Sequence, residues 1–258
     1  MRKLDLTDKT ALVLGVANPR SLAWAIAEAL GQAGCHLAFT YQGERLQQNV
    51  TSLASKFPRA PVMACDVTSE DQVAGVFARM RREFGRLDIL VHSIAFAPRE
   101  ALEGAFLDTS LEQWRTALEI SAYSFVHLAR AAAPLMEKRG GAMLALTYLA
   151  SGRVVPNYNV MGSAKAALEH AVRQLAFELG PQNIRVNAIS AGPVATLSAR
   201  GISGFTAMAS HHRAKAPLRR NIEQREVGDA ALFLCSEMSS GVTGEILFVD
   251  AGYNIMAV

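Results

Sequence analysis

The sequence predicts an α/β fold: a doubly wound, Rossmann-like, parallel sheet of about seven strands in a single domain that spans residues 1–258. Short apolar runs alternate with longer segments of helical periodicity along the whole chain. The runs are almost continuously apolar, as in strands that helices cover on both faces. No repeat, low-complexity tract or Pro/Ser-rich linker marks a boundary. Strict alternation of strand and helix implies right-handed crossovers and hence this sheet.

In the first half of the chain, apolar strand patterns occupy residues 10–15, 36–41, 61–67 and 87–95. The first ends at a glycine and precedes "SLAWAIAEALGQAG", whose apolar residues recur at helical spacing. A polar helix is expected to follow the second strand and to run through residue 55. The third precedes "SEDQVAGVFARMRREFG", where Thr68 or Ser69 supplies a helix cap.

In the second half, residues 111–137 look helical throughout, and strands are expected at 142–148, 184–190 and 245–250. A helix that carries Tyr158 and Lys165 should run to about Leu179. The last helix, "REVGDAALFLCS", precedes the final strand. In such a sheet, ligands bind beyond the carboxyl ends of the strands, so these ends are searched for a site.

The composition narrows the class of protein. Half of the 258 residues are hydrophobic and 19% are charged, which is typical of a well-packed enzyme and excludes disorder. A net charge of +3 is too small to indicate nucleic-acid binding. The three cysteines are widely spaced within apolar runs, so we expect reduced core residues, and no metal site is predicted. With no signal peptide and no membrane-spanning run recognised, the expected location is cytoplasmic.

The first strand ends in "GVANPRS". Gly15 permits a tight turn, and Ser21 is a good N-cap for the following helix. The unpaired N–H groups at that helix terminus would attract a pyrophosphate. Because the G-x-G-x-x-G pattern is absent, an ordinary strand-to-helix turn remains the alternative.

The next two strand ends are candidates for binding adenosine. Gln42 is uncharged and can hydrogen-bond ribose, whereas Arg45 as a phosphate ligand is opposed by the adjacent Glu44, which favours NADH over NADPH. Asp66 could accept from the adenine amine and Val67 could cover the ring. The alternative for Asp66 is that it only helps to start the next helix.

The fourth strand ends in "VHSIAFAP", where Ser93 and Ala95 are small enough to let the backbone approach a flat cofactor. His92 is an alternative catalyst, although a lone histidine that ends an apolar strand is more often a packed residue. The fifth strand ends at Tyr148. The alternative role of Tyr148 is aromatic packing alone.

Tyr158 and Lys165 are seven residues apart, nearly two helical turns, so on a helix both would leave the same face with Cα atoms roughly 10.5 Å apart. Taken alone, the pair could equally be an exposed helix stripe. The long connection at 190–220 is typical of a substrate lid, expected at about residues 194–216, with an apolar wall from Phe205, Ala207 and Met208. His211 and His212 are interpreted as an exposed, positively charged segment.

Five stretches resemble one family: "GVANPRSLAWAIA", "HSIAFAP", "PNYNVMGSAKAALE", "RVNAISAGPVATL" and "GEILFVDAGY". They are similar, from end to end and in order, to the bacterial NADH-dependent enoyl-acyl-carrier-protein reductases, a divergent branch of the short-chain dehydrogenase/reductases. The T-G-x-x-x-G-x-G turn, N-N-A-G strand end and Tyr-x3-Lys pair of ordinary superfamily members are absent. Two positions depart from the branch: Ala195, where relatives often carry arginine, and Ala95, which can be glycine.

The resemblance implies a role for each candidate residue. Tyr158 would stabilise the thioester enolate, Lys165 would hold the nicotinamide ribose, and Tyr148 would lie beside the enone. The implied cofactor contacts are Gly15, Ser21, Leu22, Gln42, Asp66, Val67, Ser93, Ile94, Ala95, Lys165 and Thr196, and the implied substrate contacts are Ala97, Tyr148, Tyr158 and Phe205.

The implied reaction is NADH-dependent reduction of the trans-2 double bond of enoyl thioesters in fatty-acid elongation, with an acyl carrier protein as partner and a homotetramer as assembly. The carrier could dock on Arg213, Lys215, Arg219 and Arg220, or these could form a solvated or subunit-interface face. A phenol aimed at the thioester oxygen would stabilise charge that develops only after hydride attack. The alternatives are another short-chain carbonyl or alcohol oxidoreductase, or a non-catalytic dinucleotide-binding protein.

Overall fold

The computed structural model describes residues 4–196 and 204–257. Seven strands form one parallel sheet in the order β3-β2-β1-β4-β5-β6-β7, which confirms the predicted doubly wound architecture. The strands are β1 (Thr10–Leu14), β2 (His36–Tyr41), β3 (Val62–Ala64), β4 (Ile89–His92), β5 (Gly141–Thr147), β6 (Ile184–Ala191) and β7 (Ile246–Val249). The order reverses between β1 and β4, the switch point at which such folds bind ligands.

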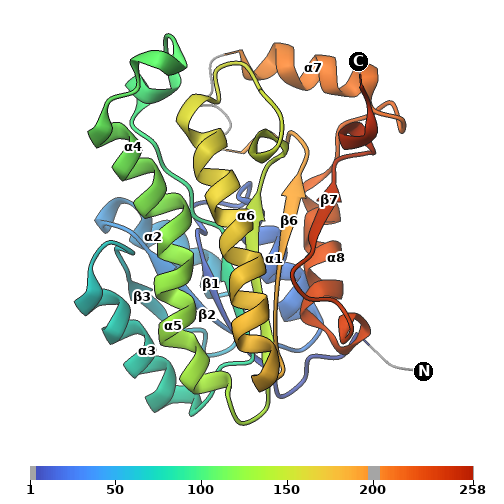
Figure 1. The fold of residues 1–258 in the computed structure, drawn as a ribbon. Coiled ribbons are helices and arrows are strands. Elements are labelled where there is room, and N and C mark those ends of the chain that lie inside the picture. Colours follow the sequence, from blue (N-terminus) through green and yellow to red (C-terminus); the bar gives the residue numbers. More distant parts are fainter. Residues whose placement is uncertain (1–3, 197–203, 258) are drawn as a thin grey trace.

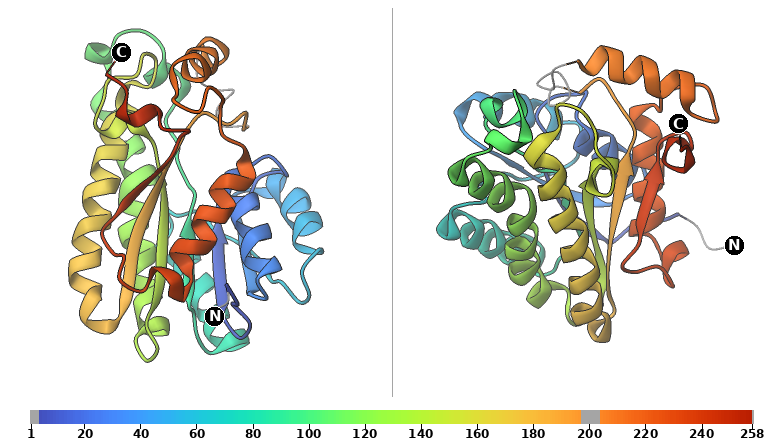
Figure 2. Two further views of the ribbon diagram at one scale, coloured as in Figure 1. Left: turned by 90° about the vertical axis from the view of Figure 1, so that its right-hand side faces the viewer. Right: turned by 45° about the horizontal axis from the view of Figure 1, so that its top comes forward.

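Helices cover both faces of the sheet (Figures 1 and 2). On one face, α3 (Glu70–Phe84), α5 (Ser124–Met136) and α6 (Asn159–Leu179) enclose a core that includes Leu12 and Leu14 of β1. On the other, α1 (Leu22–Gln32), α2 (Glu44–Ala54) and α8 (Gln224–Cys235) pack against Ala11 and Val13. Successive β1 residues therefore enter opposite cores, which explains why the strand patterns are continuously apolar.

Most predicted elements form within a few residues of the expected ends, but the long helix at 111–137 is interrupted. Helix α4 (Leu111–Leu118) passes through a π-helical turn at Glu119–Tyr123 into α5. The other difference is at α6, which begins at Asn159, so Tyr158 precedes the helix instead of lying within it. Helix α7 (Phe205–Lys215) lies beyond the carboxyl ends of the strands (Figure 1).

Candidate active site

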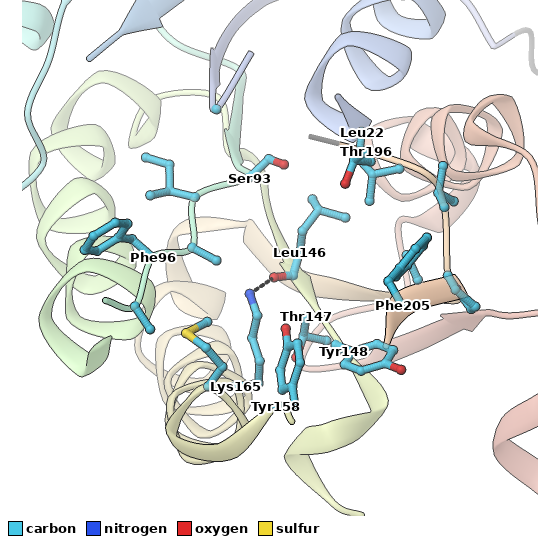
Figure 3. Close-up of a pocket in the computed structure, with 18 of the residues that line it drawn as sticks. Leu22, Ser93, Phe96, Leu146, Thr147, Tyr148, Tyr158, Lys165, Thr196 and Phe205 are labelled. Carbon is cyan, nitrogen blue, oxygen red and sulfur yellow. Dashed lines mark hydrogen bonds between the residues drawn. The ribbon is translucent and has the colours of Figure 1, made fainter. Parts of the chain in front are cut away.

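A cavity of about 770 Å³ opens at the carboxyl ends of β1, β4, β5 and β6. Figure 3 shows Tyr148, Tyr158 and Lys165 on one side of it, with Ser93 and Phe96 across from Lys165, and Phe205 beyond Tyr148. The predicted site residues that line it are Gly15, Ser21, Leu22, Ser93, Ile94, Ala95, Ala97, Tyr148, Tyr158, Lys165, Thr196 and Phe205. The fold thus gathers residues from six separate segments of the chain into one cavity.

Tyr158 occupies the N-cap position of α6, with φ −97° and ψ −19°. Its neighbours Asn157 and Asn159 both have left-handed backbone, with φ values of 63° and 36°. Asparagine tolerates this conformation better than most residues. The Asn159 side chain also donates to the Gly104 carbonyl, at 3.3 Å. The "PNYN" segment therefore turns sharply around Tyr158 before the helix starts, and the half-buried ring reaches the cavity from a turn.

Tyr148 and Tyr158 pack against each other, with ring centroids 4.9 Å apart and planes inclined by 58°. Burial raises the pKa of Tyr148 to about 12, and the neighbouring Tyr253 and Asp250 add to this effect. Burial also raises the pKa of Tyr158, and Tyr148 adds to this effect. Both phenols are therefore neutral hydrogen-bond donors at physiological pH. The Tyr148 hydroxyl donates to Met208 Sδ of α7, at 3.4 Å.

Lys165 is the seventh residue of α6, nearly two turns from the start of the helix, and is only 4% exposed. Its Nζ donates to the Leu146 carbonyl at the end of β5, at 2.7 Å (Figure 3). Burial lowers the pKa of Lys165 to about 8, and the charge of Glu169 partly opposes that shift. The ammonium thus has one short hydrogen bond and remains beside the cavity, with donors left for a ligand.

Gly15 is required by a close approach of two strand ends. Its φ is +99°, and a Cβ at this position would lie 2.1 Å from the Ser93 carbonyl oxygen. No side chain fits there. The tight contact brings the β1 turn and the Ser93–Ala97 segment together as a narrow floor for a planar group.

Ser21 takes the N-cap position of α1, but its side chain does not cap the helix, contrary to the prediction. The hydroxyl instead donates to the Asn18 carbonyl, at 2.6 Å, and so stabilises the preceding turn. Among the described residues, no acceptor takes the backbone N–H groups of Leu22 and Ala23. These free donors at a helix N-terminus suit the phosphates of a dinucleotide.

The residues predicted to bind adenosine lie outside the main cavity, at the ends of β2 and β3. The Gln42 amide donates to Asp66 Oδ2, at 3.2 Å. Asp66 Oδ1 accepts from the Thr68 amide and hydroxyl, and the backbone bond is the main reason that the pKa of Asp66 is lowered. Asp66 thus helps to shape the start of α3, while Ser69 caps that helix. Val67 is buried in the core.

His92 is fully buried and has a structural partner in the π-turn region. Its Nε2 lies 2.7 Å from Ser124 Oγ, and Ser124 itself donates to the Ile120 carbonyl. Burial lowers the pKa of His92 to about 3, and the charge of Lys165 lowers it further. The packed-residue interpretation fits this neutral imidazole better than a catalytic one.

The 194–216 segment contributes Thr196, Phe205 and Met208 to the cavity, whereas Ala207 is exposed and does not line it. Residues 197–203 of the predicted lid lie outside the described residues. The interpretation of both histidines as exposed is wrong for His212, which is 5% exposed and stacks on Tyr253 at 4.5 Å. Turning inward lets it pair with Asn221, at 3.0 Å.

The basic cluster is less uniform than the sequence suggests. Arg220 forms a two-pronged ion pair with Glu226, with both N–O distances at 2.7 Å, so its charge is largely neutralised. Arg213, Lys215 and Arg219 remain exposed. Within the described residues, no group of three histidine, cysteine or acidic side chains could hold a metal ion, and no helix is long and apolar enough to cross a membrane.

Sequence reasoning missed three parts of the site. The Leu146 carbonyl carries no side-chain signal, because a backbone acceptor can belong to any residue. Met161 lines the cavity three residues after Tyr158, and its spacing on α6 could have revealed it. Ser121 bonds both the N–H and the C=O of Phe96, at 2.9 and 3.0 Å, but only the π-turn directs it there.

Comparison with known proteins was consistent with this geometry. A profile described as enoyl-(acyl carrier protein) reductase matches residues 15–254. The NADH-dependent enoyl-acyl-carrier-protein reductases named FabI from Nostoc sp. and Neisseria meningitidis are each 49% identical, over 99% and 98% of this chain and 100% and 97% of their own.

Two solved structures match nearly completely. The Bacillus cereus enoyl-acyl carrier protein reductase, in complex with NADP+ and an indole naphthyridinone, has a TM-score of 0.96 at 49% identity and covers 98% of this chain and 99% of its own. The Anaplasma phagocytophilum reductase, in complex with NAD, has a TM-score of 0.95 at 44% identity, over 100% and 98% of the two chains.

Proposed function

Because the chain belongs to the enoyl-(acyl carrier protein) reductase family, we propose that it reduces the trans-2 double bond of enoyl thioesters, with Tyr158 and Lys165 as its principal catalytic residues. It is an NADH-dependent oxidoreductase of fatty-acid synthesis, and its substrate is carried by an acyl carrier protein. The observation that best supports the residue assignment is the meeting of Tyr158, Tyr148 and Lys165 in one cavity beside Gly15 and the Ser93–Ala97 segment.

The residues that line the cavity fit a dinucleotide. The N–H groups at the start of α1 suit its phosphates, with Ser21, Leu22 and Thr196 around them. Gly15, Ser93, Ile94 and Ala95 form a narrow floor for the nicotinamide, and Lys165 would bind the ribose hydroxyls. Gln42, Asp66 and Val67 would contact adenosine at the ends of β2 and β3.

Bound NADH would supply the hydride that adds to the β-carbon of the thioester. The electron pair of the double bond then moves onto the α-carbon and the thioester oxygen, and a proton completes the product at the α-carbon. Tyr158 is neutral and buried enough to donate a hydrogen bond to that oxygen as its charge develops. Tyr148, Ala97 and Phe205 would enclose the acyl group and exclude water.

Three further features belong to this proposal. The segment at about 194–216 would act as a substrate lid, supported by Phe205 and Met208 in the cavity wall.

A homotetramer is supported by exposed apolar side chains such as Phe177 and Ile255, which are 80% and 72% exposed in one chain. Light scattering would expose a monomer if that is wrong. A cytoplasmic location agrees with three buried, unpaired cysteines among the described residues.

The purified protein should oxidise NADH in the presence of crotonyl or longer enoyl thioesters, followed as loss of absorbance of the reduced nicotinamide. Parallel reactions with NADPH and with 3-ketoacyl thioesters serve as controls. Reduction of ketoacyl but not enoyl thioesters would favour the carbonyl-reductase alternative. Binding of NADH without turnover of any thioester would favour a non-catalytic protein.

A further inference from the structure

Three charged side chains follow Tyr158 along α6 at four-residue intervals. Lys165, Glu169 and Arg173 therefore lie on one face of the helix, at successive turns. The Lys165 residue is 4% exposed, while the side chains of Glu169 and Arg173 are 12% and 55% exposed. The row thus starts at the buried cavity wall and ends at the surface, with a carboxylate between the two cations.

Strand β5 holds the first two members of this row in place. The Leu146 carbonyl accepts from Lys165 Nζ at 2.7 Å, and the next residue, Thr147, donates its hydroxyl to Glu169 Oε1 at 2.8 Å. Thr147 is buried and lines the cavity. On the outer side, Arg173 Nη2 lies 3.9 Å from Glu169 Oε2. Consecutive β5 residues therefore fix consecutive turns of α6, and the carboxylate is held from two directions.

The other groups that face Lys165 do not supply negative charge. His92, from β4, is a neutral imidazole, and the phenols of Tyr148 and Tyr158 are protonated. Among the described residues, Lys165 makes no direct ion pair, so Glu169, one turn further along the same face of α6, acts on it only through its charge. Burial lowers the pKa of Lys165, and among the groups of residues 4–196 and 204–257 only the charge of Glu169 raises it.

We propose that Glu169, fixed by Thr147, is a positioning residue that keeps Lys165 in the ammonium form needed to bind the nicotinamide ribose. The inference rests on the proposed role of Lys165 in binding NADH. The ammonium is present below the pKa of Lys165, about 8 in this structure, and is lost as the pH rises through that value. Removing the Glu169 charge makes the ammonium less stable, so NADH affinity should begin to fall at a lower pH.

The test is the pH dependence of the NADH dissociation constant, measured by fluorescence titration between pH 6 and 10. For Glu169→Gln, the midpoint at which affinity is lost should move down by roughly one pH unit relative to the parent, a tenfold change in the proton-binding constant. Thr147→Val keeps the Glu169 carboxylate but removes the hydroxyl that donates to it. The pH midpoint should therefore move down as well, but by less. Glu169→Asp keeps the charge and should remain near the parent.

Glu178→Gln is the matched control, because Glu178 lies on the same helix and, in the part of the chain that the structure describes, accepts only from the exposed Gln174 side chain, at 2.8 Å. Its midpoint should equal that of the parent. Equal midpoints in the parent and in Glu169→Gln would overturn the inference. If Glu169→Gln does not fold, as judged by circular dichroism, Thr147→Val decides in the same way. Failure of the parent to reduce enoyl thioesters would instead overturn the proposed function, since the NADH titration does not depend on turnover.

Discussion

Helices α6 and α7 face the same cavity, but α6 has nine buried residues among its 21, whereas α7 has only His212 among its 11. The α6 residues Ala164 and Leu168 belong to two hydrophobic clusters, and Lys165 between them donates to a strand carbonyl. Tyr158 lies at the N-cap of the same helix. Phe205 and Met208, on α7, are half-buried and cover the cavity from outside. Helices with few buried contacts open locally at low cost in free energy.

The difference suggests a division of labour. Groups that must be placed accurately lie on α6, the cavity wall that the core holds rigid. Apolar groups that only cover the substrate lie on α7, the cavity wall that is free to move. The α7 helix is attached through His212, which stacks on Tyr253 and pairs with Asn221 near its end. Three substitutions would test this comparison.

The largest effect is expected for Tyr158→Phe, which keeps the ring and removes the hydroxyl. Loss of one donor to the developing oxyanion typically costs roughly 2.7–4 kcal/mol, or 10²–10³ in kcat. NADH affinity should be unchanged. Steady-state kinetics and NADH fluorescence titration measure the two quantities, with Tyr41→Phe, at the end of β2, as a control. A loss of affinity equal to the loss of kcat would contradict this role.

Lys165→Ala should weaken NADH binding by more than about tenfold, since it removes a charged donor from the ribose site and the hydrogen bond from Lys165 to the Leu146 carbonyl. Thermal unfolding separates the stability cost from the loss of affinity. An unchanged dissociation constant in a folded variant would show that Lys165 does not bind the cofactor and that the fixed wall serves another purpose.

The smallest effect is expected on the α7 side. Phe205→Ala removes a half-buried apolar contact worth about 1 kcal/mol, so KM for the enoyl thioester should rise about fivefold with kcat nearly constant. Thr206→Ala, at the adjacent exposed position, is the matched control. A drop in kcat as large as that of Tyr158→Phe would mean that α7 also positions reacting groups, and the proposed division would fail.

The fold was largely predictable from the sequence. Strand β2 formed at the expected residues, and the remaining strands formed within their predicted segments or one residue beyond. Burial on both faces leaves an unambiguous apolar pattern, and glycine, serine or proline marks many of the ends. The π-turn at Glu119–Tyr123 was not predictable, because a one-residue change of helical register leaves a nearly helical pattern.

The residues that line the cavity were predictable where residue type and a strand end mark them, as for Tyr148 and for the small Ser93 and Ala95. The site was not predictable where a partner decides the role. Ser21 has the residue type of a helix cap but donates to the Asn18 carbonyl, and Asp66 already accepts from Thr68 and Gln42. His212 is a polar residue that the sequence placed at the surface, but it is buried. The fold brings Tyr253, far along the chain, to stack on it, and a loop brings Asn221 to hydrogen-bond with it.

By itself, the sequence determined the parallel sheet, the family resemblance and the Tyr158 and Lys165 pair, because periodicity and residue type are local properties of a chain. Only the tertiary structure decided that Tyr158 enters the cavity from a turn flanked by two asparagines with left-handed backbone. It also decided that Leu146 and Thr147 hold consecutive turns of α6, and that the Glu169 carboxylate raises the pKa of Lys165. Hydrogen bonds and charge interactions depend on distances between segments, and folding alone sets these distances.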